Sequence, residues 1–209
     1  MGKDLSDYRS EYDRSVLEDK QLPDNPITLF DKWFQDLIEE DINELNAVTL
    51  ATSTTDGIPS ARIVLMKSYN DSGFTFYTNY ESKKGRELEE NPHASLLFYW
   101  PVLQRQVRIE GRVVKTSGAE SDKYFDSRPE GSRVSAIISK QSKEISSREE
   151  LEKKVQEFSS EIKRPEYWGG YRLEPHTFEF WQGRQSRLHD RICYVLESTK
   201  KWRRYRIAP

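Results

Sequence analysis

The feature that most constrains the fold of this 209-residue chain is a succession of short β-prone segments separated by turn residues. Segments Ala47–Ser53 and Ile58–Lys67 flank the pair Asp56-Gly57, and a third segment, Phe74–Thr78, follows Asp71-Ser72-Gly73. An Asp-Gly pair between two such segments is typical of a tight hairpin, because the turn needs residues that tolerate a positive φ. The sequence therefore predicts two successive hairpins, which form a meander.

The rest of the chain alternates further strands with short helices. Strands are predicted at 94–100, 105–115, 171–181, 191–197 and 201–207. Helices are predicted at 25–40, at 82–90, and after capping-box patterns at 117–127 and 147–161. The absence of βαβ alternation and of a Gly-rich phosphate loop disfavours a Rossmann fold. We predict a mainly β (α+β) fold, an antiparallel barrel with Greek-key-like strands and short flanking helices.

Composition limits the classes of function. Residues 1–22 are polar and weakly periodic, so we predict a mobile N-terminal arm there and a single domain over 23–209. The formal net charge of -2 argues against a nonspecific nucleic-acid binder, and the basic run at 200–206 is more typical of a final strand. The longest apolar stretch, 94–103, contains a proline and is too short to cross a bilayer, so we expect no membrane association.

Cysteine and histidine usage adds two further expectations. Cys193 is the only cysteine, which fits a reducing compartment, and we expect a cytoplasmic location. The three histidines are scattered, with no second metal-ligand pattern near them, so we expect no metal site.

Basic residues on the predicted elements suggest anionic ligands. Arg62 and Lys67 are separated by an odd number of positions, so in a regular strand they leave opposite faces and serve different ligands unless a bulge intervenes. Lys83 and Lys84 open a helix, where lysine is unfavourable against the helix dipole. Their presence favours a phosphate at the helix N-terminus, although a solvated charged surface is an equally good interpretation.

Two other clusters carry similar chemistry. Tyr124 and Arg128 lie four residues apart near a helix end, with Ser132 beyond the stop at Pro129, and these groups can surround a second phosphate. The segment 178–192 is rich in aromatic, cationic and titratable side chains: Trp181, Arg184, Arg187, His189, Asp190 and Arg191. If 187–191 is extended, Arg187, His189 and Arg191 point to one side, and Leu188 and Asp190 to the other.

These residues carry a resemblance to a known family. From Asn25 to Pro209 the chain resembles pyridoxine (pyridoxamine) 5'-phosphate oxidase, the FMN enzyme of vitamin B6 salvage. The matching motifs are Arg62-Ile-Val-Leu-Met-Lys67, Phe76-Tyr-Thr-Asn79, Glu81-Ser-Lys-Lys-Gly85, Arg105-Gln-Val-Arg108, Tyr124-Phe-Asp-Ser-Arg-Pro129, Gln141-Ser142, Tyr167-Trp-Gly-Gly170, Glu179-Phe-Trp-Gln-Gly183, Arg187-Leu-His-Asp-Arg191 and Arg206-Ile-Ala-Pro209. The resemblance implies an FMN-binding split β-barrel that is active as a homodimer, with FMN at the subunit interface.

The resemblance also assigns residues to ligands. The implied FMN contacts are Arg62, Ile63, Val64, Leu65, Lys67, Tyr77, Thr78, Lys83, Lys84, Gln106, Gln141, Ser142, Trp181 and Arg191. The implied substrate contacts are Lys67, Tyr124, Arg128, Ser132, Arg187, Leu188 and His189, with Arg9, Ser10, Glu11 and Tyr12 of the arm; Arg187 and His189 are the implied catalytic residues. At Lys83 the family often has arginine, so a bidentate phosphate contact is replaced by a point charge.

The implied reaction oxidises pyridoxamine 5'-phosphate or pyridoxine 5'-phosphate to pyridoxal 5'-phosphate, with O2 as acceptor and H2O2 as product. Two alternatives stay open. One is a split-barrel flavoprotein that acts on another substrate and has no need of the set Tyr124, Arg128, Ser132 and Arg187. The other is a non-catalytic protein that binds FMN or pyridoxal phosphate.

Overall fold

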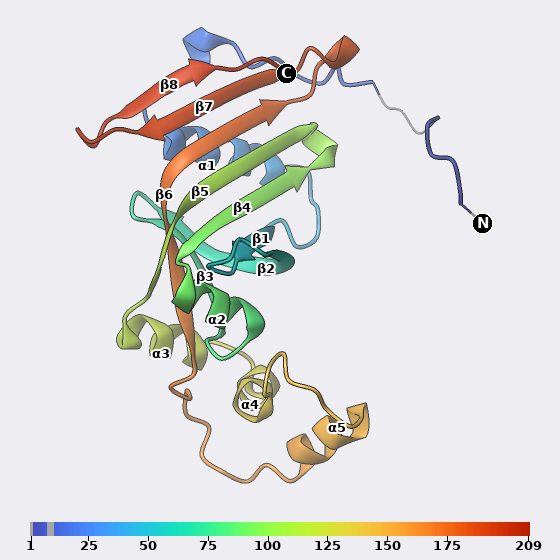
Figure 1. Ribbon diagram of the computed structural model, residues 1–209, viewed down its shortest axis with the longest axis vertical. Helices are drawn as coiled ribbons and strands as arrows, with labels where there is room; N and C mark the ends of the chain where they lie inside the picture. Colours follow the sequence, from blue (N-terminus) through green and yellow to red (C-terminus); the bar gives the residue numbers. More distant parts are fainter. Residues whose placement is uncertain (1, 8–10) are drawn as a thin grey trace. The chain divides into compact units, whose positions relative to one another are not determined.

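The computed structural model describes residues 2–7 and 11–209. The chain forms two compact units. We call Asn46–Leu96 with Glu110–Pro175 the barrel unit, and Met1–Leu45 with Leu97–Ile109 and His176–Pro209 the sheet unit (Figure 1). The division into an arm at 1–22 and a single domain at 23–209 stays a prediction.

The strands form one closed, six-stranded barrel that continues into two further strands. Their bounds are β1 Ala47–Ser53, β2 Pro59–Asn70, β3 Gly73–Asn79, β4 His93–Trp100, β5 Arg105–Lys115, β6 Trp168–Gln182, β7 Asp190–Leu196 and β8 Trp202–Arg206. The order is β3-β2-β1-β4-β5-β6-β7-β8, and an additional pairing of β3 with β6 closes the first six strands. The predicted barrel with short helices is confirmed.

The two predicted hairpins are present, and their turns have the expected chemistry. Gly57 between β1 and β2 has φ +80° and its N–H donates to the Thr54 carbonyl. Gly73 between β2 and β3 has φ +130°, and Asn70 Oδ1 accepts from the Ser72 N–H. Both glycines adopt a backbone conformation that residues with a side chain rarely enter, which is why the turns occur at these positions.

The barrel unit contains three helices that begin where they were predicted and one, α4, that was not predicted. They are α2 Lys83–Glu90, α3 Gly118–Asp126, α4 Glu130–Ile138 and α5 Arg148–Gln156. Ser82, Ser117 and Ser147 each accept a backbone N–H with their side chain, from Gly85, Glu120 and Glu150 respectively. α5 ends before the predicted position near Glu161, because it buries no residue and local preference alone sustains a helix only briefly.

Helix α4 was not expected, and it changes the interpretation of Ser132. Pro129 ends α3 as predicted, but with φ −52° and ψ 143° it is also the N-cap of α4. Ser132 therefore lies in a helix rather than in a loop. The segment Glu130–Ile138 contains glycine, two serines and β-branched residues, so its helix preference is weak and tertiary packing decides its structure.

In the sheet unit, α1 (Pro26–Ile38) packs its apolar face on strand residues of the same unit (Figure 1). Asn25 caps the helix by accepting from the Ile27 N–H, and Pro26 occupies the first turn as expected. Phe30 is fully buried and its ring lies 5.2 Å from that of Phe98. Trp33 meets Phe180 edge to face at 5.2 Å.

The alternation expected for 187–191 does not occur. Gln185–Arg187 is a 3-10 turn in which Ser186 and Arg187 have φ of 54° and 60°. β7 begins only at Asp190, so the residues from Arg187 to His189 are not extended. The inference that Arg187, His189 and Arg191 share one side was therefore wrong in its premise, because two consecutive left-handed residues break the strand geometry on which it depended.

The aromatic packing under α1 predicts a large loss of stability for Phe30→Ala. Removal of a fully buried phenyl ring leaves a cavity, and we expect the free energy of unfolding to fall by about 3–5 kcal/mol. Denaturant unfolding of wild type and variant measures this change. Lys32→Ala, at an exposed position of the same helix, is the matched control and should change stability little. A similar effect of both substitutions would contradict the packing described here.

Candidate functional site

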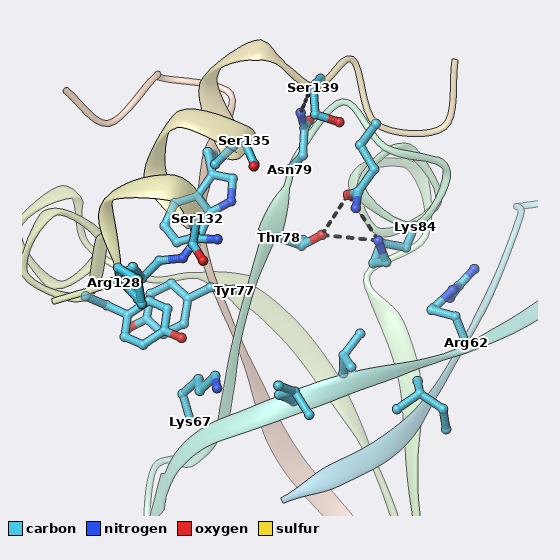
Figure 2. Close-up of a pocket in the computed structure, with 18 residues that line it drawn as sticks. Arg62, Lys67, Tyr77, Thr78, Asn79, Lys84, Arg128, Ser132, Ser135 and Ser139 are labelled. Atoms are coloured by element: carbon cyan, nitrogen blue, oxygen red, sulfur yellow. Dashed lines mark hydrogen bonds between the residues drawn. The ribbon is translucent and has the colours of Figure 1, made fainter. Parts of the chain in front are cut away.

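The barrel unit contains a pocket of about 770 Å³, a volume typical of small-molecule sites (Figure 2). Its wall combines cationic, hydroxyl and aromatic side chains. The lining residues are Arg62, Ile63, Val64, Leu65, Lys67, Tyr77, Thr78, Asn79, Lys84, Tyr124, Arg128, Pro129, Ser132, Ser135, Ala136, Ser139, Gln141 and Trp168. Most of the residues predicted for FMN or for a substrate phosphate are therefore brought together.

Strand β2 supplies one wall of this pocket, and a bulge changes what its residues can reach. The pairing of β2 with β3 shifts register between Met66 and Ser68, which places the irregularity at Lys67. Arg62 and Lys67 both line the pocket, so the expected separation onto opposite faces does not hold. A β-bulge re-aims the side chain at which it occurs, and this is the exception that the alternation argument left open.

The cations occupy two sides of the pocket. Figure 2 shows Arg62 and Lys84 on one side and Lys67 and Arg128 on the other. Positive charge is therefore present at two separate parts of the cavity, and each can attract an anionic group.

On the first side, Lys84 is surrounded by neutral oxygen atoms. Its Nζ lies 3.2 Å from Thr78 Oγ1 and 3.3 Å from Gln141 Oε1 (Figure 2). The pKa of Lys84 is lowered to about 8, mainly by burial and also by the nearby charge of Arg62, while Glu87 acts in the opposite direction. An anion bound beside this ammonium group would restore the charge balance that burial removes.

The neighbouring Lys83 is placed differently. Its side chain is 61% exposed, and Nζ lies 3.8 Å from Glu87 Oε1. Its backbone N–H donates to Ser142 Oγ at 3.1 Å. At the helix start predicted to bind a phosphate, the backbone N–H groups of Lys83 and Gly85 therefore already donate to side chains, that of Lys83 to Ser142 and that of Gly85 to Ser82.

On the second side, Arg128 lies over an aromatic stack. Its guanidinium carbon is 4.7 Å from the centre of the Trp168 ring. The rings of Tyr77 and Tyr124 stack at 3.9 Å. Nη1 of Arg128 is buried without a hydrogen-bond partner among the described residues, and burial lowers the pKa of this guanidinium. A buried donor without a partner is costly, and an anionic oxygen atom would satisfy it.

The remaining predicted residues lie in the sheet unit. Trp181 and Arg191 are direct partners in the β6–β7 ladder, so their side chains share a face. The Trp181 ring lies 4.7 Å from that of His189, and Tyr12 contacts both rings edge on at 5.7 Å. Arg187 and Leu188 are exposed, Glu11 is exposed and Gln106 is half-buried. Arg9 and Ser10 lie outside the described residues.

The proton position on His189 follows from its neighbour. The backbone N–H of Arg184 donates to His189 Nδ1 at 3.1 Å, so the neutral ring carries its proton on Nε2. Burial lowers the pKa of His189, and the charge of Arg187 lowers it further. His189 is therefore neutral over a wider pH range than an unperturbed histidine.

A nearly fully buried carboxylate orients Arg191. Glu179 has a side-chain exposure of 3%; it accepts from Arg191 Nε at 2.7 Å and from Arg108 Nη2 at 2.5 Å. Arg191 also donates to the Ala208 carbonyl at 3.0 Å.

Sequence reasoning missed several pocket residues. These are Asn79, Pro129, Ser135, Ala136, Ser139 and Trp168. Ser132, Ser135 and Ser139 recur at helical spacing, which would have indicated a polar helix face if α4 had been recognised.

Two kinds of feature are absent from the described part of the chain. Within residues 2–7 and 11–209, no group of three or more His, Cys, Asp or Glu residues is arranged to hold a metal ion. No helix in these same ranges combines the length and the apolar character needed to cross a membrane.

Comparison with known proteins adds independent information. Residues 34–161 match the family described as "Pyridoxamine 5'-phosphate oxidase", and residues 168–209 match the "Pyridoxine 5'-phosphate oxidase C-terminal dimerisation region". Proteins named pyridoxine/pyridoxamine 5'-phosphate oxidase are similar over full length: that of Paraburkholderia phymatum is 53% identical over 98% of this chain and 99% of its own. That of Trichormus variabilis is 49% identical over 100% of both chains.

Solved structures agree on the fold. PhzG from Burkholderia lata, in complex with tetrahydrophenazine-1-carboxylic acid, is 35% identical with a TM-score of 0.88, over 96% of this chain and 100% of that chain. A pyridoxamine 5'-phosphate oxidase-related, FMN binding protein from Nostoc punctiforme, 15% identical, has a TM-score of 0.73 over 88% of this chain and 98% of its own. The matches across both parts of the sequence lead to one conclusion: this chain belongs to the pyridoxamine 5'-phosphate oxidase family.

Proposed function

We propose that this protein is an FMN-dependent oxidase that converts pyridoxamine 5'-phosphate and pyridoxine 5'-phosphate to pyridoxal 5'-phosphate, with O2 as acceptor and H2O2 as product. The reaction of the amine also consumes water and releases ammonia. Family membership supports an oxidase of this type. The finer assignment to B6 phosphates depends on the chemistry of the pocket.

The observation that carries this proposal is the buried Nη1 of Arg128, which has no hydrogen-bond partner in the part of the chain that the structure describes and lies in a pocket that Lys67 and Ser132 also line. A guanidinium group stacked on Trp168 keeps its N–H donors in the plane of the group, available to an anion beside it. A phosphate monoester supplies several acceptor oxygen atoms and a negative charge. The substrate phosphate is therefore assigned to Lys67, Tyr124, Arg128 and Ser132.

The opposite side of the pocket fits the phosphate of FMN. Arg62 and Lys84 supply two positive charges there, and Thr78 and Gln141 supply polar groups. The desolvated ammonium of Lys84 is the observation that supports a bound anion at this position. Ile63 is 63% exposed and Leu65 37% exposed on the β2 wall, which suits apolar contact with a flat ring system.

When bound, FMN supplies the two-electron acceptor for the hydride from the 4' carbon of the substrate, and O2 is the final oxidant. The protein then has to bind and orient the flavin and the substrate and to exclude water from them. We assign Trp181 and Arg191 to the flavin, and Arg187 and His189 to the pyridine ring of the substrate. His189, neutral with its proton on Nε2, is suited to donate a hydrogen bond to the ring hydroxyl.

A homodimer with FMN at the subunit interface completes the proposal. The match of residues 168–209 to a dimerisation region supports a homodimer. We also propose a cytoplasmic location, because the sequence contains a single cysteine, Cys193, and a chain with one cysteine forms no internal disulfide.

The similarity to PhzG favours a second candidate, an oxidase of a partly reduced polycyclic carboxylic acid. Such a substrate has a carboxylate but no phosphate. The cationic group around Arg128 is better matched to the larger charge and the additional oxygen atoms of a phosphate, so we rank this candidate second.

Purified protein reconstituted with FMN should oxidise both B6 phosphates and form one H2O2 for each pyridoxal 5'-phosphate. Steady-state absorbance and peroxide assays, with FMN titrated in, measure this. Turnover of tetrahydrophenazine-1-carboxylic acid alone would favour the second candidate. Flavin binding without turnover of any of these compounds would favour a carrier.

Arg128→Ala should raise KM for pyridoxamine 5'-phosphate by about tenfold or more, because a charge-assisted contact to the phosphate is lost. The affinity for FMN should not change, since Arg128 lies on the other side of the pocket from Arg62 and Lys84. Arg148→Ala, whose side chain is 85% exposed, is the matched control. An unchanged KM, or an equal loss of FMN affinity, would remove Arg128 from the substrate site.

The lowered pKa of Lys84 predicts a pH dependence of FMN binding. Below about pH 8 the unliganded protein carries an ammonium group here; above this pH the group loses its proton and its attraction for the FMN phosphate. FMN affinity should therefore fall as pH rises from 8 to 9.5, by up to about tenfold per pH unit. Quenching of FMN fluorescence measures the affinity.

Two comparisons isolate the role of Lys84. Lys84→Met should lose this pH dependence, and Lys83→Met, with its more exposed side chain, should keep it. Riboflavin lacks the phosphate and should show no dependence in any variant. A constant FMN affinity of the wild type from pH 7 to 9.5 would contradict the assignment.

A further inference from the structure

Helix α2 buries a carboxylate, Glu87, beside the pocket residue Arg62. The side chain of Glu87 is 5% exposed and that of Arg62 is 20% exposed, and Glu87 Oε2 lies 3.2 Å from Arg62 Nη2. A buried carboxylate is costly unless hydrogen bonds and an opposite charge replace its lost hydration. The groups that compensate Glu87 therefore indicate what it does.

Two hydroxyl groups connect this carboxylate to the guanidinium of Arg62. Thr52 Oγ1 and Ser60 Oγ donate to Glu87 Oε2 at 2.5 and 2.6 Å. The same oxygen atoms accept from Arg62, Thr52 from Nη1 and Ser60 from Nη2. A hydroxyl can donate once and accept at the same time, so both contacts are compatible. Glu87 thus contacts Arg62 directly and is also connected to it through the bridging hydroxyl groups of Thr52 and Ser60.

The direction of these hydrogen bonds agrees with an ionised Glu87. Burial by itself raises the pKa of Glu87, but the hydrogen bonds from Ser60, Thr52 and Arg62 outweigh burial and hold the pKa below its ordinary value. The second oxygen atom, Oε1, is buried without a hydrogen-bond partner among the described residues, and Lys83 Nζ lies 3.8 Å from it. All the hydrogen bonds described here therefore converge on the oxygen atom that faces Arg62.

We propose that Glu87 is a positioning residue for the cofactor phosphate: it fixes the guanidinium of Arg62, directly and through Thr52 and Ser60, on the side of the pocket that Lys84 shares. This inference rests on the proposed function, in which Arg62 contacts the phosphate of FMN. A guanidinium held in place before the ligand arrives loses less freedom on binding and presents its planar fork in one orientation.

Glu87 has two opposite effects on the binding of an anionic ligand. Their balance determines whether Glu87→Gln weakens or strengthens FMN binding. Its negative charge repels a phosphate, so charge alone predicts tighter FMN binding by Glu87→Gln. Loss of positioning predicts weaker binding, because a glutamine oxygen accepts more weakly and its NH2 group faces donors. Positioning dominates because Arg62 at 3.2 Å and Lys83 at 3.8 Å already compensate the Glu87 charge.

The test compares FMN with riboflavin, which has the same ring system without the phosphate. Dissociation constants for both are measured on flavin-free protein by fluorescence titration, for wild type, Glu87→Gln and the control Glu90→Gln, an exposed position on the same helix. We expect Glu87→Gln to weaken FMN binding roughly tenfold, as for the loss of a charged hydrogen-bond network. Riboflavin binding, and both affinities of Glu90→Gln, should match the wild type.

A second comparison shows whether Glu87 acts through Arg62. If it does, Glu87→Gln adds little further loss of FMN affinity in an Arg62→Ala background, because the group that it positions is gone. Equal losses in both backgrounds would overturn the proposal, as would tighter FMN binding by Glu87→Gln or a parallel loss of riboflavin binding. If circular dichroism shows that Glu87→Gln does not fold, Ser60→Ala replaces it and should give a smaller loss, again specific to FMN.

The outcomes also separate this inference from the function on which it rests. Wild-type protein that binds neither flavin would refute the proposed function itself. Wild-type protein that prefers FMN to riboflavin, with an unchanged preference in Glu87→Gln and Ser60→Ala, would refute only the role of Glu87.

Discussion

The pairing of β3 with β6 is the interaction on which the pocket depends. It joins segments far apart in the chain, with Tyr77 opposite Gly170 and Thr78 opposite Gly169, and it closes the barrel. Side chains approach both glycines closely: a Cβ at Gly169 would lie 2.2 Å from the Tyr80 hydroxyl, and one at Gly170 would lie 2.5 Å from Thr116 Oγ1, so a larger residue at either position would displace its neighbours. Without this closure, Trp168 would not stack on Tyr77, and Arg128 would lose the aromatic surface that supports it.

Two of the arginines that we propose as ligand contacts, Arg62 and Arg191, are held by the same electrostatic arrangement. In the barrel unit Glu87, with a side-chain exposure of 5%, holds Arg62; in the sheet unit Glu179, with an exposure of 3%, holds Arg191. Each carboxylate is compensated by the arginine that it orients, so the cost of burying the negative charge is offset by a guanidinium held in one place. Arg128 and Lys84 differ, because aromatic rings and neutral oxygen atoms surround them and leave their positive charge for a ligand.

The sequence predicted a helix or strand boundary well wherever the residues that determine it lie within a few positions of it. The glycine turns after Asp56 and at Gly73, the serine caps at Ser117 and Ser147 and the helix starts near Ser82 and at Pro26 all appear at the expected residues. Inferences that assumed regular geometry failed. The bulge at Lys67 brings that residue and Arg62 to one pocket, and the left-handed backbone at Ser186 and Arg187 breaks the run 187–191. Helix α4, with weak local preference, was not expected.

The pattern of residues along the chain was enough for the fold class, the family and most of the polar residues that line the pocket, because turn chemistry, capping and ordered motifs are local properties. Only the tertiary structure decided which of these residues share a cavity, that Arg128 has a buried donor without a partner among residues 2–7 and 11–209, and that Glu87 contacts Arg62. Burial and hydrogen-bond partners depend on segments far apart in sequence, and for Glu87 they come from β1, β2 and α2 together. No periodicity along a single element contains that information.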